Sequence, residues 1–202
     1  EPFVFTIGET YYFDLAEKEI PGTVNNALPD TSLHYVPFTY VGMIDSYSLT
    51  DADQDSEEMF SASPYTRPLF IAEHNIMNDV SWKELYDANA VFMYGKNCKV
   101  GNSGLGFYLR TPTGGSKPAE EASRGGIPQE NEWDAILKKD AGLIKNDLNV
   151  YSWCQDMEAG SSTKRALRAN GMAVWKSEDP EVKAGYRPVL EGSYDCRMDP
   201  KC

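Results

Sequence analysis

The sequence predicts a globular domain of the α+β class, with many short strands and two short helices. The chain has 202 residues, enough for one large domain with a well-filled core. Its 41% hydrophobic and 25% charged residues are ordinary values for a globular protein. Short runs of aromatic and β-branched residues alternate with turn residues, and only two segments have helical spacing. Together these features favour an α+β domain.

The charge balance disfavours two classes of partner. Lys and Arg total 19 and Asp and Glu total 31, which gives a net charge of −12. Nucleic acid and anionic membrane surfaces both bind concentrated basic surfaces, so neither is expected as a partner. No stretch approaches the roughly 18 apolar residues that span a bilayer, and no signal peptide is visible. An acidic surface suits a protein outside a cell or on a virion, so we expect an extracellular location.

Residues 1–62 form a first zone that is rich in Tyr, Phe, Val and Thr. Strands are predicted at residues 3–7 and 33–44, and Pro37 indicates an edge position or a bulge in the second. The zone ends in an acidic stretch at residues 50–58. We interpret residues 1–62 as a β-rich extension packed on a main domain of residues 63–202.

The second zone contains both predicted helices. A short strand is expected at residues 68–72. Ser81 followed by Glu84 is a capping-box pattern, so a helix should begin there. A strand at residues 107–110 leads into a long loop, residues 111–129, and loops of this length tend to be functional or mobile. Apolar residues at helical spacing then predict a helix over residues 130–139.

The third zone contains four further predicted strands. Their aromatic and β-branched residues place them at residues 150–154, 165–168, 171–175 and 185–190.

The four cysteines leave two readings open. Cys196 with Cys202 and Cys98 with Cys154 would give two disulfides in an oxidising compartment. The alternative is four reduced thiols, two of them buried. Zinc is not expected, since the chain has no CxxC pair.

An ordered series of motifs occupies the C-terminal half: Leu109-Arg110-Thr111-Pro112-Thr113, Asn131-Glu132-Trp133-Asp134, Tyr151-Ser152-Trp153-Cys154, Arg165-Ala166-Leu167-Arg168, Trp175 and Gly185-Tyr186-Arg187-Pro188. The series resembles the C-type-lectin-like branch that includes formylglycine-generating enzymes, bacterial paralogous surface domains and the variable proteins of diversity-generating retroelements. The resemblance covers residues 107–190. The chain departs from the family at Ala169-Asn170-Gly171, where a Gly pair is common, and in the long loop after Thr113.

The resemblance implies a C-type-lectin-like fold whose ligand surface lies at about residues 156–183. An exposed Trp beside Asn, Arg and acidic residues suits recognition of a sugar or a protein, because the ring stacks and the polar groups fix orientation. Trp175 as an ordinary core residue is the alternative. The predicted ligand-binding residues are Tyr151, Asp156, Arg165, Arg168, Asn170, Trp175, Lys176, Glu178 and Asp179.

Two tryptophans and two arginines of the motif series have an expected structural role. Large aromatic residues dominate core energetics, so Trp133 and Trp153 are expected to be core anchors. Arg168 and Arg187 lie in predicted strands, where a charge needs a partner, and carboxylates such as Asp134 or Asp156 would supply one.

Catalysis is not expected. Cys196 and Cys202 lack the flanking motif of formylglycine-generating enzymes, and no acidic pair stands out as a glycosidase site. His34 and His74 have no Ser or Cys partner in a recognisable triad. We therefore expect no cofactor.

Calcium is the one metal with a candidate sequence. Asp51, Asp53 and Asp55 alternate as in a calcium loop, but Ser56 and Ala62 stand where that loop needs Gly and Glu. A solvated acidic loop is the favoured reading.

Two functions remain open. The first is an adhesin-like or phage receptor-binding domain that binds a glycan or a cell-surface protein. The second is a structural subunit of an extracellular fibre or virion assembly, in which the chain would form an oligomer. An exposed Trp175 would favour the first, and a large apolar face on the Tyr-rich first zone would favour the second.

Overall fold

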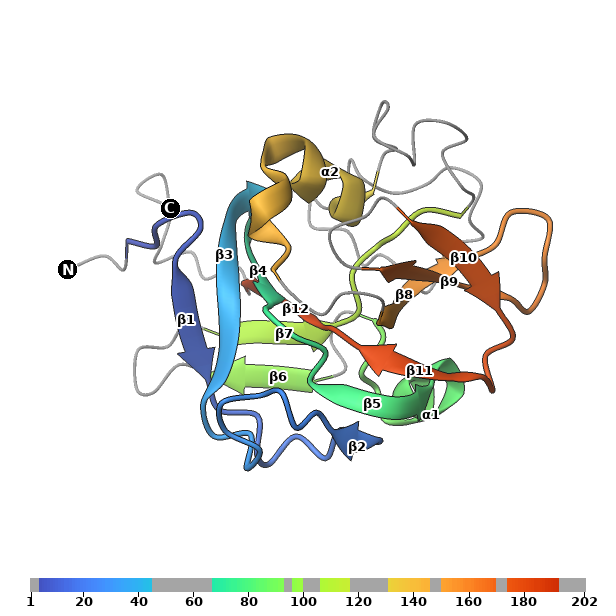
Figure 1. Ribbon diagram of the computed structural model, residues 1–202, viewed down its shortest axis with the longest axis horizontal. Coiled ribbons are helices and arrows are strands. Elements are labelled where there is room, and N and C mark those ends of the chain that lie inside the picture. The colour runs from blue at the N-terminus through green and yellow to red at the C-terminus, as the bar shows by residue number, and fades with distance from the viewer. Residues whose placement is uncertain are drawn as a thin grey trace.

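The residues that the structure describes form two six-stranded sheets and two short α-helices, so the class is α+β as predicted (Figure 1). These elements come from a computed structural model, which describes the following ranges: residues 4–44, 67–92, 96–99, 106–116, 131–145, 150–169 and 174–192.

The first sheet is antiparallel throughout and curves around an aromatic core. Figure 1 shows β1 and β3 crossing the direction of β7 and β6 at a steep angle. This curvature brings the ring of Phe13 on β1 to 5.4 Å from that of Phe107 on β7, although three strands separate β1 from β7 in the sheet. The strands in spatial order are β1 (Thr10–Phe13), β3 (Val36–Ile44), β4 (Arg67–Ala72), β12 (Val189–Gly192), β7 (Gly106–Arg110) and β6 (Lys96–Lys99).

The second sheet includes one parallel contact. Gly185 of β11 lies beside Ser152 of β8 in parallel orientation, and the other neighbouring strands are antiparallel. The strands in spatial order are β10 (Trp175–Glu178), β9 (Arg165–Ala169), β8 (Tyr151–Met157), β11 (Lys183–Tyr186), β5 (Met77–Ser81) and β2 (Thr23–Val24).

The helix at Ser81 begins as the sequence predicts, and the one predicted over residues 130–139 begins two residues later, at Glu132. The helix α1 (Trp82–Asp87) has Ser81 as its N-cap, and the reciprocal hydrogen bonds with Glu84 form a capping box. The helix α2 (Glu132–Lys139) is capped by Asn131 and buries Trp133 and Ile136. A 3-10 turn, η2 (Ala141–Leu143), follows it.

The closing segment differs from its prediction. Residues 185–190 were expected to form one strand, but the chain ends β11 at Tyr186 and starts β12 at Val189 in the other sheet. Pro188 has no N–H for a sheet ladder and restricts Arg187 before it. This two-residue crossover joins the two sheets.

The N-terminal predictions need correction as well. Residues 4–9 form no strand, and β1 starts only at Thr10, after a turn in which Gly8 has φ +87°. In β3 the bulge lies between Tyr40 and Gly42 rather than at Pro37. Strands β1, β2, β5 and β6 were not predicted, and β10 begins at Trp175, where the strand predicted at residues 171–175 was expected to end. Short strands depend on pairing partners that are distant in sequence, which a local pattern does not reveal.

The first zone shares both sheets with the rest of the chain. Strand β3 pairs with β4 over residues 38–44, and β2 pairs with β5. The proposed boundary at residue 62 therefore lies in sequence between strands that hydrogen-bond directly to each other.

The buried hydrophobic residues that the structure describes form two clusters. The larger one contains edge-to-face rings of Phe13, Phe38, Phe70 and Phe107, together with Trp153. The smaller one lies under α2 and includes Trp133. Both Trp133 and Trp153 are fully buried, so their prediction as core anchors is confirmed.

Candidate ligand-binding surface

The predicted ligand-binding residues lie on the three strands β8, β9 and β10, at one edge of the second sheet. Residues paired across these strands share a face, so Ser152, Arg168 and Trp175 project to one side and Trp153, Leu167 and Lys176 to the other. The first side packs on residues 111–116 and α2, and we call it the α2 face. The second side packs against β5 and α1, and we call it the α1 face.

Buried charge pairs dominate the α2 face. Arg168 is 1% exposed, and its Nη2 donates to Asp134 Oδ1 at 2.6 Å. Its Nη1 donates to the Gly114 carbonyl at 2.8 Å, and the guanidinium lies 5.7 Å from the centre of the Trp133 ring. The predicted pairing of Arg168 with Asp134 is confirmed. Arg187 instead donates to the carbonyls of Ala72 and Lys145.

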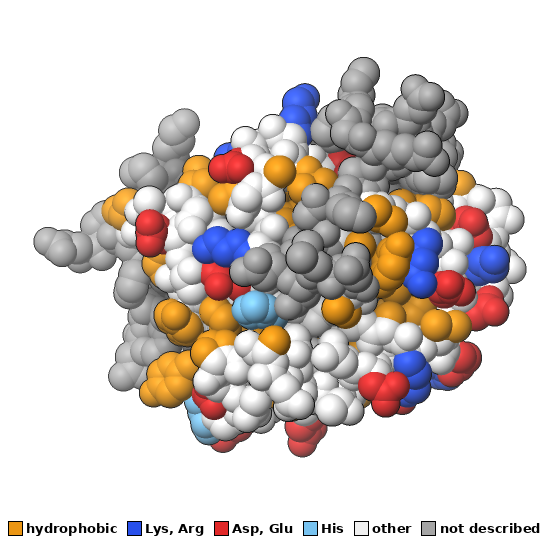
Figure 2. All heavy atoms as spheres, in the orientation of Figure 1, with side chains coloured by type: hydrophobic (Ala, Val, Ile, Leu, Met, Phe, Trp, Pro, Cys, Tyr) orange, Lys and Arg blue, Asp and Glu red, His pale blue; other side chains and the backbone are white. Residues whose placement is uncertain are grey.

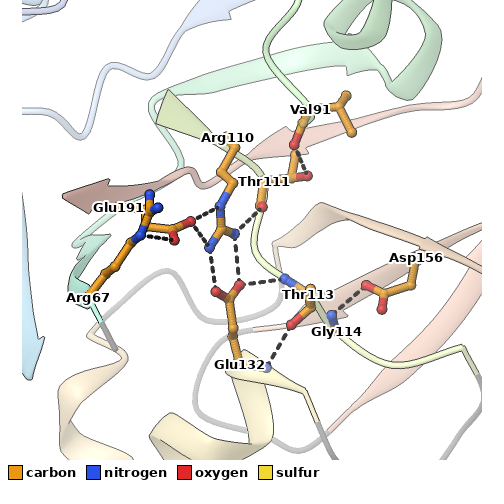
Figure 3. A network of polar contacts seen from close by, with 9 residues as sticks. All are labelled: Arg67, Val91, Arg110, Thr111, Thr113, Gly114, Glu132, Asp156 and Glu191. Atoms are coloured by element: carbon orange, nitrogen blue, oxygen red, sulfur yellow. Dashed lines mark hydrogen bonds and ion pairs between the residues drawn. The ribbon is translucent and has the colours of Figure 1, made fainter. Parts of the chain in front are cut away.

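A second buried arginine extends this region towards the first sheet (Figure 3). Arg110 lies between two carboxylates: its Nε is 2.9 Å from Glu191 Oε2 and its Nη1 is 2.9 Å from Glu132 Oε2. Burial would lower the pKa of Arg110, but the charges of Glu132 and Glu191 raise it. This arginine therefore stays charged in the interior.

Glu132 and Asp156 hold residues 111–116, which are buried without forming a strand or helix. Glu132 accepts from Thr113 N at 2.8 Å, and Asp156 accepts from Gly114 N at 2.6 Å (Figure 3). A Cβ on Gly114 would lie 2.5 Å from Cys154 Sγ, so only glycine fits this contact. The predicted long loop thus begins as a fixed interior segment, and its residues 117–129 lie outside the described residues.

The rim of the α1 face is half-exposed and combines cations with aromatic rings. Lys176 Nζ lies 4.3 Å from the centre of the Tyr151 ring and 3.3 Å from Glu178 Oε1. Arg165 lies opposite Glu178 on β9, and its Cζ is 4.0 Å from the centre of the Trp82 ring. Such cation–π contacts contribute about 0.5–1 kcal/mol where they are partly solvated. We call Tyr151, Arg165, Lys176 and Glu178 the cation–aromatic strip.

Trp175 begins the edge strand β10 and points to the α2 face. It is half-buried, and its Nε1 donates to the Gly115 carbonyl at 2.8 Å. That bond fixes the indole orientation while the residue stays partly accessible. Trp175 is thus neither a fully buried core residue nor a freely exposed one. Figure 2 shows hydrophobic, basic and acidic side chains mixed over the part of the molecule where Figure 1 places β10.

The structure separates the nine predicted residues into three groups. Asp156 and Arg168 are each 1% exposed, so their placement on a ligand surface is corrected: their charged groups hold interior contacts. Asn170 lies outside the described residues. The remaining six are accessible at least in part: Tyr151, Arg165, Trp175, Lys176, Glu178 and Asp179.

Sequence reasoning missed the aromatic group that continues the strip. Tyr86 is 39% exposed and stacks on Trp82 at 5.2 Å with an interplanar angle of 11°, and Phe92 contacts both rings edge-on. The signal was present, because Trp82 and Tyr86 are four residues apart and so share one helix face. The spacing could not reveal that Arg165, which is distant in sequence, lies over the Trp82 ring.

Of the two alternatives for Cys98 and Cys154, the structure has the reduced one: both are buried free thiols. They lie on strands of different sheets, with Lys18 and Lys96 near Cys98 and Asp156 and Arg168 near Cys154. Burial raises the pKa of Cys98 to about 11 and that of Cys154 well above its usual value. Cys196 and Cys202 lie outside the described residues.

The part of the chain that the structure describes lacks two kinds of feature. No group of three or more His, Cys, Asp or Glu there is arranged to hold a metal ion. No described helix is long and apolar enough to cross a membrane. The weak calcium pattern at residues 51–55 lies outside the described residues.

No protein-family model, curated protein or solved structure matches the chain.

Proposed function

We propose that this chain is a non-catalytic ligand- or receptor-binding domain with a C-type-lectin-like fold, located outside the cell or on a virion. The binding surface comprises the cation–aromatic strip together with Trp175 and Asp179. Its ligand is a glycan or a cell-surface protein.

The observation that carries this proposal is the edge of the second sheet. Five of the predicted residues are half-buried there, and four of them are aromatic or lie over an aromatic ring: Tyr151, Trp175, Lys176 and Arg165. Half-buried aromatic and Arg side chains beside polar groups are the composition of binding hot spots. Because Trp175 is hydrogen-bonded to Gly115, less side-chain entropy would be lost when a ligand contacts it.

The charge distribution supports the same surface. Residues 156–183 contain five Lys or Arg and five Asp or Glu, whereas residues 1–62 contain twelve Asp or Glu and one Lys. The acidity of the chain therefore lies mostly in its first zone, away in sequence from the proposed surface. A charge-balanced surface can contact neutral and weakly charged ligands without long-range repulsion.

The fold part of the proposal rests on the order of the motifs. The Arg-x-Leu-Arg segment forms β9 and the Gly-Tyr segment forms β11, and both strands lie beside β8. The Glu-Trp helix α2 contacts this layer through Asp134 and Arg168. Motifs that are distant in sequence thus meet in one layer, which supports the C-type-lectin-like reading.

A binding screen tests the proposal. The parent protein, a Trp175→Ala, Lys176→Ala double variant and a Tyr35→Ala control are compared on a glycan array and on whole bacterial cells. Tyr35 is 67% exposed and belongs to the first zone, so its replacement should leave binding unchanged. Loss in the double variant alone supports the proposal. Binding that the double variant retains places the site elsewhere.

A second candidate, a structural subunit of an extracellular assembly, has its own supporting observation. Several large hydrophobic side chains of the first zone are exposed, and the described ones are Val4, Ile7, Tyr12, Tyr35 and Met43. Such apolar surface favours a protein contact. Sedimentation of the parent and of a Tyr12→Ser, Met43→Ser variant distinguishes the candidates. Self-association that the double replacement abolishes favours the assembly subunit.

A further inference from the structure

The edge strand β10 has a backbone pattern that selects one class of ligand. Within the described residues, β10 is the outermost strand of its sheet and pairs only with β9. Trp175, Lys176, Ser177 and Glu178 are all half-buried. An edge strand presents a row of backbone donors and acceptors that another extended chain can pair with.

The register shows which groups face the open edge. Ala169 N donates to Val174 O at 3.3 Å, so these two residues form a hydrogen-bonded pair. Bonded and non-bonded pairs alternate in an antiparallel ladder, so Lys176 and Glu178 use their backbone groups towards β9. The N–H and C=O groups of Trp175 and Ser177 point the other way, to the open edge.

The side chains of β10 alternate between the two faces. Trp175 points to the α2 face, where its indole is bonded to Gly115. Lys176 and Glu178 point to the α1 face, where Lys176 lies over Tyr151. A single pyranose ring that stacks on Trp175 lies on the opposite side of the strand from Lys176. An added strand contacts both faces, because its own side chains alternate in the same way.

We propose that the protein binds an extended peptide segment of a partner protein by β-strand addition to the open edge of β10. This inference rests on the proposed binding function and narrows its ligand to a polypeptide. The backbone groups of Trp175 and Ser177 pair with the incoming strand. Charge complementarity places an acidic peptide residue opposite Lys176 and a basic one opposite Glu178, as Arg165 already lies opposite Glu178 on β9. An apolar peptide residue lies against Trp175.

Ser177 offers a matched pair of variants. Ser177→Pro removes an edge-facing N–H and places a ring at the edge, while the backbone bonds of Lys176 and Glu178 to β9 stay in place. Ser177→Ala keeps the N–H and is the control. The probe is a random twelve-residue peptide library displayed on phage and selected on the immobilised parent protein. Selected peptides are then made synthetically, and their affinity is measured by fluorescence polarisation.

Peptides should bind the parent and Ser177→Ala equally and Ser177→Pro at least about tenfold more weakly, as expected for a lost backbone hydrogen bond and a steric block. Circular dichroism checks that Ser177→Pro is folded. If it is not, the same peptides carrying an N-methyl group at each position in turn are tested on the parent. N-methylation should then weaken binding at every second peptide position, because only every second N–H of an added strand faces β10.

Two results would overturn the inference: a library without binders, or peptides that bind Ser177→Pro as tightly as the parent. The proposed function fails separately. If cells or glycans bind the parent and Ser177→Pro alike but not the Trp175→Ala, Lys176→Ala variant, the surface is a binding site for a ligand that is not an added strand.

Discussion

The two faces of the β8–β9–β10 layer use the same residue type for different purposes. Arg168 on the α2 face is 1% exposed and is held by Asp134 and Gly114. Arg165, three residues earlier on the same strand, is half-exposed and lies over Trp82. A buried charge is fixed by its partners and costs much to disturb, whereas a charge at the surface adds little stability and stays available to a ligand. The buried charges of the α2 face should therefore govern stability, and the half-exposed charges of the α1 face should contribute to binding together with Trp175.

The largest expected effect is on the α2 face. Replacement of Arg168 by Met leaves the Asp134 carboxylate buried without its cation, at a cost of about 3–5 kcal/mol in the free energy of unfolding. Replacement of Arg165 by Met is the matched change on the α1 face and should cost about 1 kcal/mol or less, because a partly solvated cation–π contact is weak. Urea denaturation of both variants gives the comparison.

Equal losses in the two arginine variants would contradict the distinction between the faces. Ligand binding, once a ligand is known, should respond in the opposite order. Arg165→Met should weaken it, and Arg168→Met should matter only by lowering the folded fraction.

A smaller effect is expected where residues 111–116 meet the strands. An alanine at position 114 brings its Cβ to 2.5 Å from Cys154 Sγ and 2.9 Å from Arg168 Cγ. Overpacking of this kind costs about 1–3 kcal/mol. Cys154→Ala removes the sulfur, so the Gly114→Ala cost should shrink in that background. A double-mutant cycle from thermal unfolding measures the coupling. Simple additivity of the two costs would show that the close approach is relieved in another way.

Local patterns predicted much of the fold. The Ser81 and Glu84 capping box, the helix α2 and the strands β4, β7 and β9 follow from caps and from runs of strand-forming residues. The crossover at Arg187 and Pro188 did not follow, because the destination of a strand depends on which partners remain unpaired elsewhere. The same limit applied to Cys98 and Cys154. The even number of cysteines in the chain was consistent with pairing of Cys98 and Cys154, but the strand order places these two residues in different sheets.

The candidate site was only partly predictable, because long-range contacts decide which of its side chains are buried. Residues three apart on a strand point to opposite faces, so the sequence indicated that Arg165 and Arg168 differ. Which face is interior depends on Gly114 and Asp134, which contact Arg168 from 54 and 34 residues earlier in the chain. The pairing of Arg168 with a carboxylate was predictable because a buried charge requires one. The position of Arg165 over Trp82 was not.

The smallest effect concerns an exposed ion pair in the first zone. His34 Nδ1 lies 3.1 Å from Asp14 Oδ2, and the two side chains are 55% and 63% exposed. The hydrogen bond and charge of Asp14 raise the pKa of His34 above 6.5, and the hydrogen bond with His34 lowers the pKa of Asp14 below 3.8. The histidine contribution is complete below its unfolded pKa and is lost as pH rises through its folded value. The aspartate contribution is present above its unfolded pKa and is lost as pH falls through its folded value.

Between these limits His34 and Asp14 are both charged, so their ion pair stabilises the fold from about pH 4 to about pH 6.5. His34→Gln should therefore lower the melting temperature slightly at about pH 5 and leave it unchanged at about pH 8.5. Because solvent screens this pair, about 1 M salt should abolish the difference in melting temperature between His34→Gln and the parent at about pH 5. The destabilisation caused by Arg168→Met should persist in the same salt, because that ion pair is buried. A His34→Gln effect as large as that of Arg168→Met, or one that persists in salt, would break the link between burial and stability on which the comparison of the two faces depends.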